Sequence, residues 1–271
     1  MRDLRGCRAL VTGATGGLGG PIARALAAEG AHVVVSGRRG KVLAGLVREL
    51  GATAVVADLA DVSQIERVAE EAGEVDILVN AAGIIFYPAF TDLVRGDLER
   101  GVAVNLTSPM LLVHRLLPGM LERGRGHVVC LSSLAGYAYP AYQAVYASTK
   151  AGLVALMRSL RAEYRTTPIG FSVVSPIYVE EAGVYADNVA PHGLRSPRLV
   201  GTVGPDRVAR AVVRAVRRDL ADVIVASRPM RPVFALGALS PRLGDAILRW
   251  TGVDDLQRRA AEVHREEPPR T

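Results

Sequence analysis

A tyrosine and a lysine four residues apart have the types and the spacing to carry out proton transfer. Tyr146 and Lys150 lie in a helical pattern, so we expect both side chains on one face of a helix. A free tyrosine has a pKa of ~10, whereas proton transfer at neutral pH works best near ~7. A neighbouring ammonium group favours the phenolate and lowers that pKa. On its own, such a pair is more often an exposed helix pair.

A serine precedes this pair and adds to its chemistry. Ser133 lies thirteen residues before Tyr146, at the end of an apolar run, and its hydroxyl could reach the same substrate oxygen. Lys150 is one of only two lysines among 33 basic residues, the other being Lys41. Because arginine is so strongly preferred, a lysine at this position is informative.

A glycine-rich segment follows the first apolar run and opens a helical pattern. Glycines there allow a sharp turn and let backbone N–H groups approach a pyrophosphate at the positive end of the helix. An ordinary glycine turn is the alternative, but the position after a first strand argues against it. The predicted cofactor contacts in this loop are Gly13, Thr15, Gly16, Gly17, Leu18 and Gly19.

The end of the second apolar run predicts which dinucleotide binds. NAD-binding chains commonly place an acidic residue there for the ribose 2′-hydroxyl. This chain has Gly37 followed by Arg38 and Arg39, and guanidinium groups suit a 2′-phosphate. We therefore expect NADP(H) to be preferred over NAD(H), although arginine is common throughout the chain.

Strand-length apolar runs alternate with helical patterns along most of the chain. Strands are expected at 8–12, 32–36, 54–57, 77–80, 127–131, 171–174 and 223–225, and helices near 18–29, 41–50, 62–72, 97–123, 144–166 and 205–219. The alternation predicts an α/β fold of the Rossmann type: a doubly wound, seven-stranded parallel sheet with helices on both faces. We expect one domain, 1–271.

Two segments lie outside the alternation. Residues 177–203 follow the sixth run, at the edge where ligands bind in such sheets, and are expected to form an irregular substrate lid containing Tyr178, Tyr185 and His192. Residues 232–271 are expected to form a C-terminal helical extension. Its apolar stripe (Leu243, Ala246, Ile247 and Trp250) could pack on the domain, form a subunit contact or add to a substrate wall.

Taken together, these motifs resemble those of the short-chain dehydrogenases/reductases. The matching pieces are Thr12–Gly19, Asp58-Leu59, Asn80-Ala81-Ala82-Gly83, Asn105, Ser133, Tyr146, Lys150 and Pro176, in the family's order over roughly residues 5–225. The resemblance implies that Tyr146 moves the proton, Ser133 holds the substrate oxygen, and Lys150 lowers the Tyr146 pKa and binds the nicotinamide ribose. It implies that Asn105 positions a water, a role compatible with a helix-kinking asparagine.

The resemblance also implies cofactor contacts beyond the glycine-rich loop. Asp58 and Leu59 would lie at the adenine, although Asp58 could equally be a helix cap. The remaining expected contacts are Asn80, Ala81, Ala82, Gly83, Tyr146, Lys150, Pro176, Ile177 and Val179. The family often has Asn at position 81, usually Gly at 177 and Thr at 181, where this chain has Ala81, Ile177 and Glu181. The departures at 177 and 181 affect how the nicotinamide is expected to be contacted and how the adjoining lid is expected to be formed.

Composition excludes several other classes of protein. Two cysteines, Cys7 and Cys130, provide neither a disulfide scaffold nor a zinc site, and they favour a reducing compartment. No metal is expected. The N-terminus lacks a signal-peptide core and no run resembles a membrane span, so a soluble, cytoplasmic protein is predicted.

The net charge of +6 comes entirely from the last quarter of the chain, and we expect no nucleic-acid partner. Residues 1–194 carry 18 basic and 18 acidic side chains, whereas residues 195–271 carry 15 arginines against 9 acids. We expect a solvated basic helix face at Arg207, Arg210, Arg214, Arg217 and Arg218. A weak contact with anionic membrane or an acidic acyl carrier is the alternative for this region.

These observations predict an NADP(H)-dependent oxidoreductase that interconverts a ketone or aldehyde and an alcohol, with a bulky hydrophobic substrate. A non-enzymatic NADP-binding regulator or scaffold is one alternative, and enoyl reduction or epimerisation on the same fold is another. By resemblance, a homodimer or homotetramer is expected to form through the helices near 97–123 and 144–166.

Overall fold

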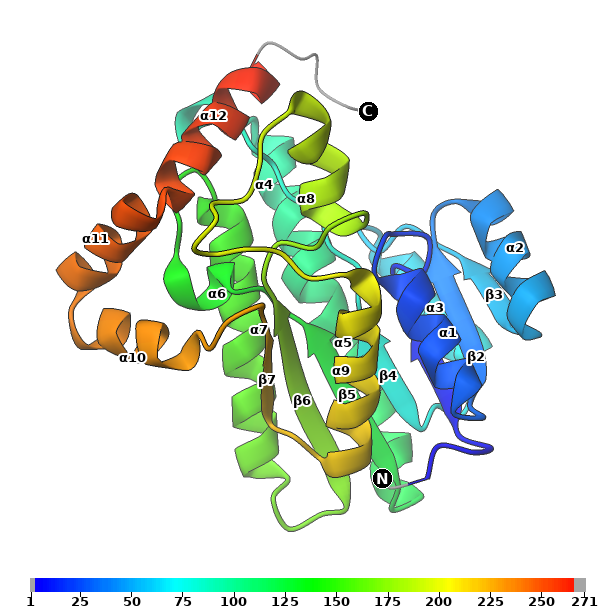
Figure 1. Ribbon diagram of the computed structural model, residues 1–271. Helices are drawn as coiled ribbons and strands as arrows, with labels where there is room; N and C mark the ends of the chain where they lie inside the picture. Colours follow the sequence, from blue (N-terminus) through cyan, green and yellow to red (C-terminus); the bar gives the residue numbers. More distant parts are fainter. Residues whose placement is uncertain (1–2, 266–271) are drawn as a thin grey trace.

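Seven apolar segments form one parallel sheet in the computed structural model, which describes residues 3–265 (Figure 1). The strands are β1 (Arg8–Val11), β2 (His32–Gly37), β3 (Thr53–Val56), β4 (Ile77–Asn80), β5 (Gly126–Leu131), β6 (Ile169–Pro176) and β7 (Asp222–Val225). Their order is β3-β2-β1-β4-β5-β6-β7. The predicted doubly wound, seven-stranded sheet is confirmed, and every residue of β5 and β6 is buried, as for strands covered on both faces.

Helices cover both faces of this sheet, and each face has its own apolar core. On one face, α1 (Gly19–Ala28), α2 (Gly40–Leu50) and α9 (Pro205–Arg218) pack with side chains such as Ile22 and Val212. On the other face, α3 (Val62–Ala72), α5 (Ser108–Glu122) and α7 (Ala144–Glu163) pack with side chains such as Leu112 and Leu153. The two cores hold the strand ends, and therefore the loops after them, in fixed positions.

The helix predicted over 97–123 is interrupted. The chain forms α4 (Arg95–Val102), a π-helical turn at Ala103–Thr107 and then α5. A π turn inserts an extra residue into the hydrogen-bond ladder and re-aims the side chains within it. Asn105 lies in this turn, which agrees with the structural alternative of a helix-kinking asparagine.

The segment predicted to be the substrate lid is more ordered than expected. Residues 177–203 contain α8 (Gly183–Asn188) and a 3₁₀ turn at Ala190–His192, and Val179 pairs with Val203 in a single β-bridge. The expectation of a wholly irregular segment is therefore wrong. Its Gly and Pro residues obscured a helix of only six residues, too short to leave a periodic signal.

The C-terminal extension consists of three helices: α10 (Arg231–Leu239), α11 (Pro241–Thr251) and α12 (Val253–Arg265). Figure 1 shows α12 running beside the lid, whereas α10 and α11 project to one side of the domain. The predicted stripe on α11 does not pack on the domain, because Leu243, Ala246 and Trp250 are exposed. Residues 266–271 of the predicted extension lie outside the described residues.

The five arginines of α9 form the solvated face that was predicted. All are exposed, while the opposite side of the helix is buried against the sheet. None of the helices within residues 3–265 is long and apolar enough to cross a membrane.

Candidate active site

One large cavity lies at the carboxyl ends of the strands. It has a volume of about 2200 Å³ and extends from the loop after β1, past the ends of β5 and β6, to α10 and α11. This is well above the ~300–1,000 Å³ of pockets for drug-sized ligands. The cavity is therefore large enough for a dinucleotide together with a substrate.

Most of the predicted site residues line this cavity. Those that do so are Gly13, Thr15, Gly16, Gly17, Leu18, Arg38, Arg39, Asp58, Leu59, Ala81, Ala82, Gly83, Ser133, Tyr146, Lys150, Pro176, Ile177 and Val179. Gly19, Asn80 and Asn105 are not among the residues that line it.

The glycine-rich loop after β1 is held by close backbone approaches. Gly13 has φ +64°, and a Cβ there would lie 2.6 Å from Cα of Ala82. A Cβ on Gly17 would lie 2.1 Å from the backbone nitrogen of Gly183, where the lid meets the loop. Neither position has room for a side chain. The loop thus presents bare backbone to the cavity.

The loop also presents the positive end of α1. Leu18 occupies the N-cap position and carries no oxygen that could cap the first N–H groups, and the first turn has no acidic residue. An anion in the cavity is therefore favoured at this terminus. Together with the bare glycines, this arrangement fits the pyrophosphate of a dinucleotide.

Two arginines lie where the second strand meets this loop. A Cβ on Gly37 would lie 2.7 Å from Oγ1 of Thr15, so β2 must end in a glycine here. The guanidinium group of Arg39 donates to the carbonyl oxygen of Thr15. Arg38 and Arg39 both line the cavity and are exposed to it. The cavity is therefore positively charged beside the glycine-rich loop.

Asp58 lies at the same end of the cavity and is ionised. Burial opposes its ionisation, but hydrogen bonds from Arg100 at 2.7 Å and from the backbone of Ala60 at 3.0 Å outweigh it, so its pKa lies below the ordinary aspartate value. It does not cap α3, because Asp61 does so through the N–H of Ser63. The helix-cap alternative for Asp58 is therefore wrong.

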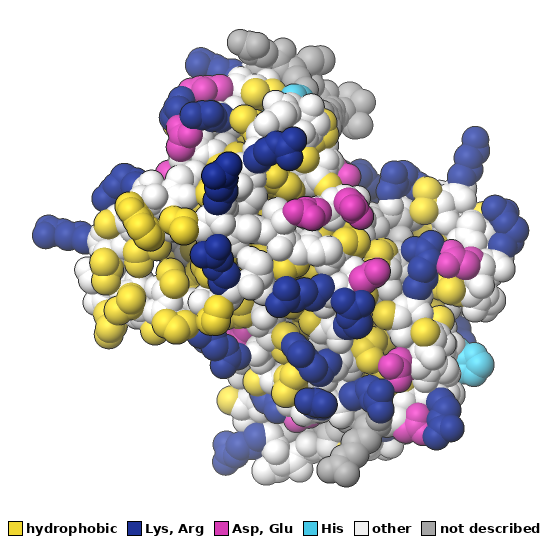
Figure 2. All heavy atoms as spheres, in the orientation of Figure 1, with side chains coloured by type: hydrophobic (Ala, Val, Ile, Leu, Met, Phe, Trp, Pro, Cys, Tyr) yellow, Lys and Arg dark blue, Asp and Glu magenta, His cyan; other side chains and the backbone are white. Residues whose placement is uncertain are grey.

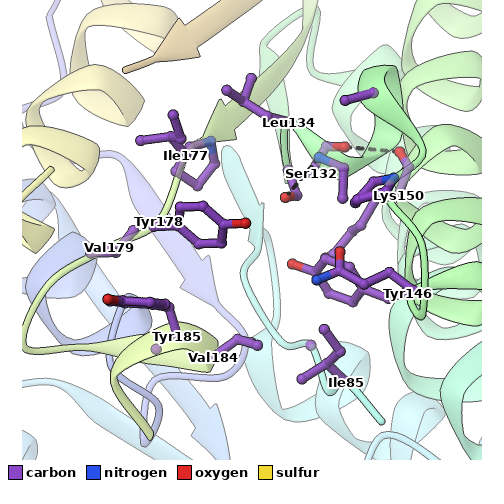
Figure 3. Close-up of a pocket in the computed structure, with 18 of the residues that line it drawn as sticks. Ile85, Ser132, Leu134, Tyr146, Lys150, Ile177, Tyr178, Val179, Val184 and Tyr185 are labelled. Atoms are coloured by element: carbon purple, nitrogen blue, oxygen red, sulfur yellow. Dashed lines mark hydrogen bonds between the residues drawn. The ribbon is translucent and has the colours of Figure 1, made fainter. Parts of the chain in front are cut away.

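Tyr146 and Lys150 lie together in the cavity (Figure 3), and Ser133 lines the same cavity. The Tyr146 phenol hydrogen-bonds with Ser133, and the Lys150 ammonium nitrogen lies 5.6 Å from the centroid of the Tyr146 ring. The same nitrogen donates to the carbonyl oxygen of Leu131 at 2.8 Å. The phenol of Tyr146, the hydroxyl of Ser133 and the amine of Lys150 thus line the same part of the cavity.

The pKa values of this group differ from the expectation. Burial raises the pKa of Tyr146 to about 12, with the Ser133 hydrogen bond acting in the opposite direction. Burial also lowers the pKa of Lys150 to about 8. The predicted lowering of the Tyr146 pKa by Lys150 is therefore not found, because burial is the dominant influence on the phenol.

Asn105 fixes the segment that passes beside Lys150. Its side-chain amide donates to the carbonyl oxygen of Ile84 and accepts from the N–H of Ile84, both at 2.8 Å. It also donates to Oγ1 of Thr149 on α7 at 3.2 Å. The π turn thereby ties the loop after β4 to the helix of Tyr146. Thr149 was missed by sequence reasoning, since a Thr inside a helix carries no signal of such a contact.

The loop after β4 is also tied to β1. The hydroxyl of Thr12 accepts hydrogen bonds from the N–H groups of Ala81 and Ala82, at 3.1 and 3.3 Å. Asn80, buried behind them, donates to Sγ of Cys130 at 3.6 Å. Its side-chain oxygen has no protein partner within the described part of the chain. The backbone at Ala81 and Ala82, which lines the cavity, is thus held by contacts with the ends of β1 and β5.

The two departures at the lid have different structural consequences. Ile177 is buried in the core, and its N–H donates to the carbonyl oxygen of Val225 at 2.9 Å. Its φ is not positive, so its backbone conformation does not require the family's glycine. Glu181 has φ +61°, a left-handed conformation that is strained for glutamate. Of the two positions, only 181 therefore has a strained backbone conformation.

Tyr178 forms the wall opposite Tyr146, and the C-terminal extension holds it there (Figure 3). Its ring packs against that of Tyr185 with the centroids 5.1 Å apart. Its hydroxyl accepts a hydrogen bond from Nε2 of Gln257 on α12 at 2.9 Å. Gln257 is buried and was missed, because a polar residue within a charged helix gives no sequence signal of burial.

Comparison with known proteins agrees with this geometry. The model of the short chain dehydrogenase family matches residues 8–190. The chain is 37% identical to the ketoacyl reductase HetN of a Nostoc species, covering 97% of this chain and 95% of that protein. It is 35% identical to dehydrogenase/reductase SDR family member 7B of Rattus norvegicus, over 89% and 79%. The closed form of serine dehydrogenase complexed with NADP+ superposes with a TM-score of 0.73 at 27% identity, over 82% and 94%.

Proposed function

The chain belongs to the short-chain dehydrogenase family of oxidoreductases, and we propose that it interconverts a ketone or aldehyde and an alcohol, using NADP(H). One observation carries the proposal: Ser133, Tyr146 and Lys150 meet in a cavity that begins at an uncapped helix terminus behind a glycine-rich loop. That loop supports nicotinamide dinucleotide binding, and the three side chains provide acid–base chemistry at the substrate oxygen.

The preference for NADP(H) is supported by charge. Arg38 and Arg39 line the cavity directly after β2, where no carboxylate stands to repel a 2′-phosphate. Each guanidinium group can give a phosphate two parallel hydrogen bonds. A solved relative of this fold is complexed with NADP+.

The chemistry that a bound nicotinamide supplies is hydride transfer. The protein's side chains donate and accept the proton. The Ser133 oxygen accepts the N–H of Ala135 at 3.1 Å, which leaves the hydroxyl proton to bind the substrate oxygen. Tyr146 donates its proton to that oxygen as the alcohol forms, and removes it in the reverse direction. Lys150 stabilises the phenolate that results.

The substrate is proposed to be bulky and hydrophobic. The substrate end of the cavity is walled by Ile85, Val184, Phe234, Ile247 and Leu248, from the loop after β4, the lid, α10 and α11. A long acyl chain would bury apolar surface there at roughly 25 cal/mol per Å². Because a similar protein is named a ketoacyl reductase, a 3-ketoacyl thioester is the first substrate class to test.

The domain, the cellular compartment and the assembly of the chain are also proposed. We propose that residues 1–271 act as one catalytic domain in the cytoplasm, with 177–203 as the substrate lid. Homodimers or homotetramers would form through α4, α5 and α7. Sedimentation of the purified chain tests the assembly, and a monomer at all concentrations would contradict it.

The test of the activity is NADPH oxidation over a graded set of carbonyl compounds. We expect 3-ketoacyl thioesters and bulky cyclic ketones to be reduced with kcat/KM rising as the apolar part grows. Small polar carbonyls such as pyruvate serve as the comparison. A preference confined to the small polar compounds would overturn the hydrophobic-substrate proposal, and no oxidation with any carbonyl would overturn the reaction.

A further inference from the structure

The surface of α10 and α11 carries an apolar patch that no other described part of the chain covers. We call Leu236, Leu239, Leu243 and Trp250 the α10–α11 patch. Leu239 is 82% exposed and Trp250 is 76% exposed. Figure 2 shows apolar side chains gathered over these two helices, at the left of the view. Contiguous exposed apolar surface of this kind marks an interaction site.

The residues of the patch are not needed for the packing of α10 against α11. They pack against each other at Gly237 and Gly244, where a Cβ on either residue would lie 3.5 Å from the Cα of the other. The domain-facing side uses other residues: Phe234 stacks on Tyr137 with the centroids 5.7 Å apart, and Leu248 packs against the core. The outward leucines and the tryptophan are therefore free to contact something else.

The segment that carries this patch is rich in arginine. Residues 226–251 contain Arg228, Arg231, Arg242 and Arg249 against a single carboxylate, Asp245. All four arginines are exposed, and none is in an ion pair with any residue between 3 and 265. The partner of the patch must therefore offer negative charge beside apolar groups.

A second copy of the chain does not meet this requirement. A two-fold interface would place the patch against itself and bring the two sets of arginines together. An anionic lipid surface does meet it, because phosphate groups surround an apolar interior and tryptophan favours the boundary between them. Leu236 and Trp250 of the patch also line the outer end of the cavity, so a membrane bound here would lie at the substrate end.

We propose that the α10–α11 patch binds the surface of anionic lipid bilayers, with Leu239 and Trp250 inserted at headgroup depth and the arginines paired with lipid phosphates. Binding to the membrane does not depend on the reaction proposed above. Its consequence, direct entry of a lipid-like substrate from the bilayer, does rest on that reaction.

Trp250 makes the test direct, because it is the only tryptophan in the chain. Its fluorescence is followed as vesicles of phosphatidylcholine, with or without phosphatidylglycerol, are added to the intact protein at low salt. We expect a blue shift with the anionic vesicles, quenching by bromine-labelled acyl chains, and little change with phosphatidylcholine alone. Soluble glycerol phosphate is the headgroup control and should produce no shift.

Two variants separate the apolar and charged parts of the proposal. Leu239→Glu should abolish the shift, whereas the matched control Val62→Glu, at a 56% exposed position on α3, should preserve it. Arg242→Ala should weaken partitioning about fivefold, the equivalent of ~1 kcal/mol per basic residue. Arg48→Ala, an exposed arginine on α2, should have no effect.

Three results would overturn the proposal. The first is no shift with anionic vesicles, and the second is unchanged binding by Leu239→Glu. The third is a drop in solution mass of Leu239→Glu without lipid, which would make the patch a contact between copies.

Circular dichroism and urea unfolding verify that this variant is folded, and Leu239→Ser is the milder second variant. A Trp250 shift on adding an acidic acyl carrier protein, with none on vesicles, would also contradict lipid binding.

Discussion

The Lys150 ammonium nitrogen lies 5.6 Å from the centroid of the Tyr146 ring, with both residues on the same side of α7. Burial raises the pKa of Tyr146 to about 12 and lowers that of Lys150 to about 8, so at neutral pH Tyr146 is a neutral phenol whereas Lys150 is still largely protonated. Proton donation by Tyr146 creates a phenolate beside an amine that can carry positive charge. The positive charge of Lys150 therefore lies beside the position where the negative charge of Tyr146 develops during proton donation.

The Lys150 pKa predicts how stability changes with pH. Its folded-state pKa of about 8 lies below the ordinary 10.5, so the unfolded chain binds the extra proton between these values. The cost of the buried charge is therefore present at lower pH and is relieved as pH rises from about 8 to 10. We expect this group to raise the free energy of unfolding by at most ~1.4 kcal/mol per pH unit in that window.

Urea unfolding of Lys150→Met between pH 7.5 and 10 measures this contribution, since the variant should lack that rise. Lys41→Met is the matched control, because Lys41 is the only other lysine and is exposed on α2. A wild-type pH dependence that survives in Lys150→Met would contradict the shifted pKa.

Asn105 is predicted to be a positioning residue. Asn105→Ala leaves both backbone groups of Ile84 without their side-chain partner, and we expect a loss of about 3 kcal/mol in the free energy of unfolding. The loop beside Lys150 should loosen, so kcat should fall while KM for NADPH changes little. Steady-state kinetics and urea unfolding measure the two effects.

Thr149→Val is the graded control for Asn105. It removes the 3.2 Å acceptor on α7, together with the donation of the same hydroxyl to the Tyr146 carbonyl oxygen at 2.8 Å, and it leaves both Ile84 bonds in place, so a smaller loss of about 1 kcal/mol is expected. Equal losses in the two variants would show that the Ile84 contacts are not what Asn105 contributes.

The arginines after β2 are predicted to select the cofactor. Arg38→Ala and Arg39→Ala should each raise KM for NADPH by about 10-fold or more, as expected for losing a charge-assisted hydrogen bond to phosphate, while KM for NADH stays nearly constant. Arg48→Ala on α2 is the control. If KM for both cofactors rises equally, the arginines support the loop and do not read the 2′-phosphate.

The hydrogen bond between Gln257 and Tyr178 is predicted to hold the cavity wall. Gln257→Leu keeps the packing of α12 but leaves the Tyr178 hydroxyl without this donor. We expect a several-fold higher KM for bulky ketones and an unchanged dissociation constant for NADPH, measured by nucleotide fluorescence. A change confined to NADPH binding would show that the contact supports the cofactor end instead.

Local signals in the sequence predicted the fold and much of the site. The seven strands were visible as Val- and Ile-rich runs because buried parallel strands are apolar on both faces. Tyr146 and Lys150 were visible because their spacing matches one helical turn. The contacts of Asn105 with Ile84 and of Gln257 with Tyr178 join distant segments, and no local pattern encodes them.

The apolar stripe on α11 shows a second limit of sequence patterns. Periodicity revealed that Leu243 and Trp250 share a face, but it could not reveal that nothing in the described chain covers that face. Similarly, the i, i+4 spacing of Tyr146 and Lys150 placed two groups together without showing how far burial would shift their pKa values.

The central claim is that Tyr146 is the proton donor to a substrate carbonyl. The most direct test is the rate of NADPH oxidation by Tyr146→Phe with the best ketone substrate, at saturating cofactor. We predict a loss of at least ~100-fold in kcat with unchanged NADPH affinity, while Tyr164→Phe, at the far end of α7, retains full activity. A Tyr146→Phe enzyme that turns over at a rate close to wild type would contradict the account.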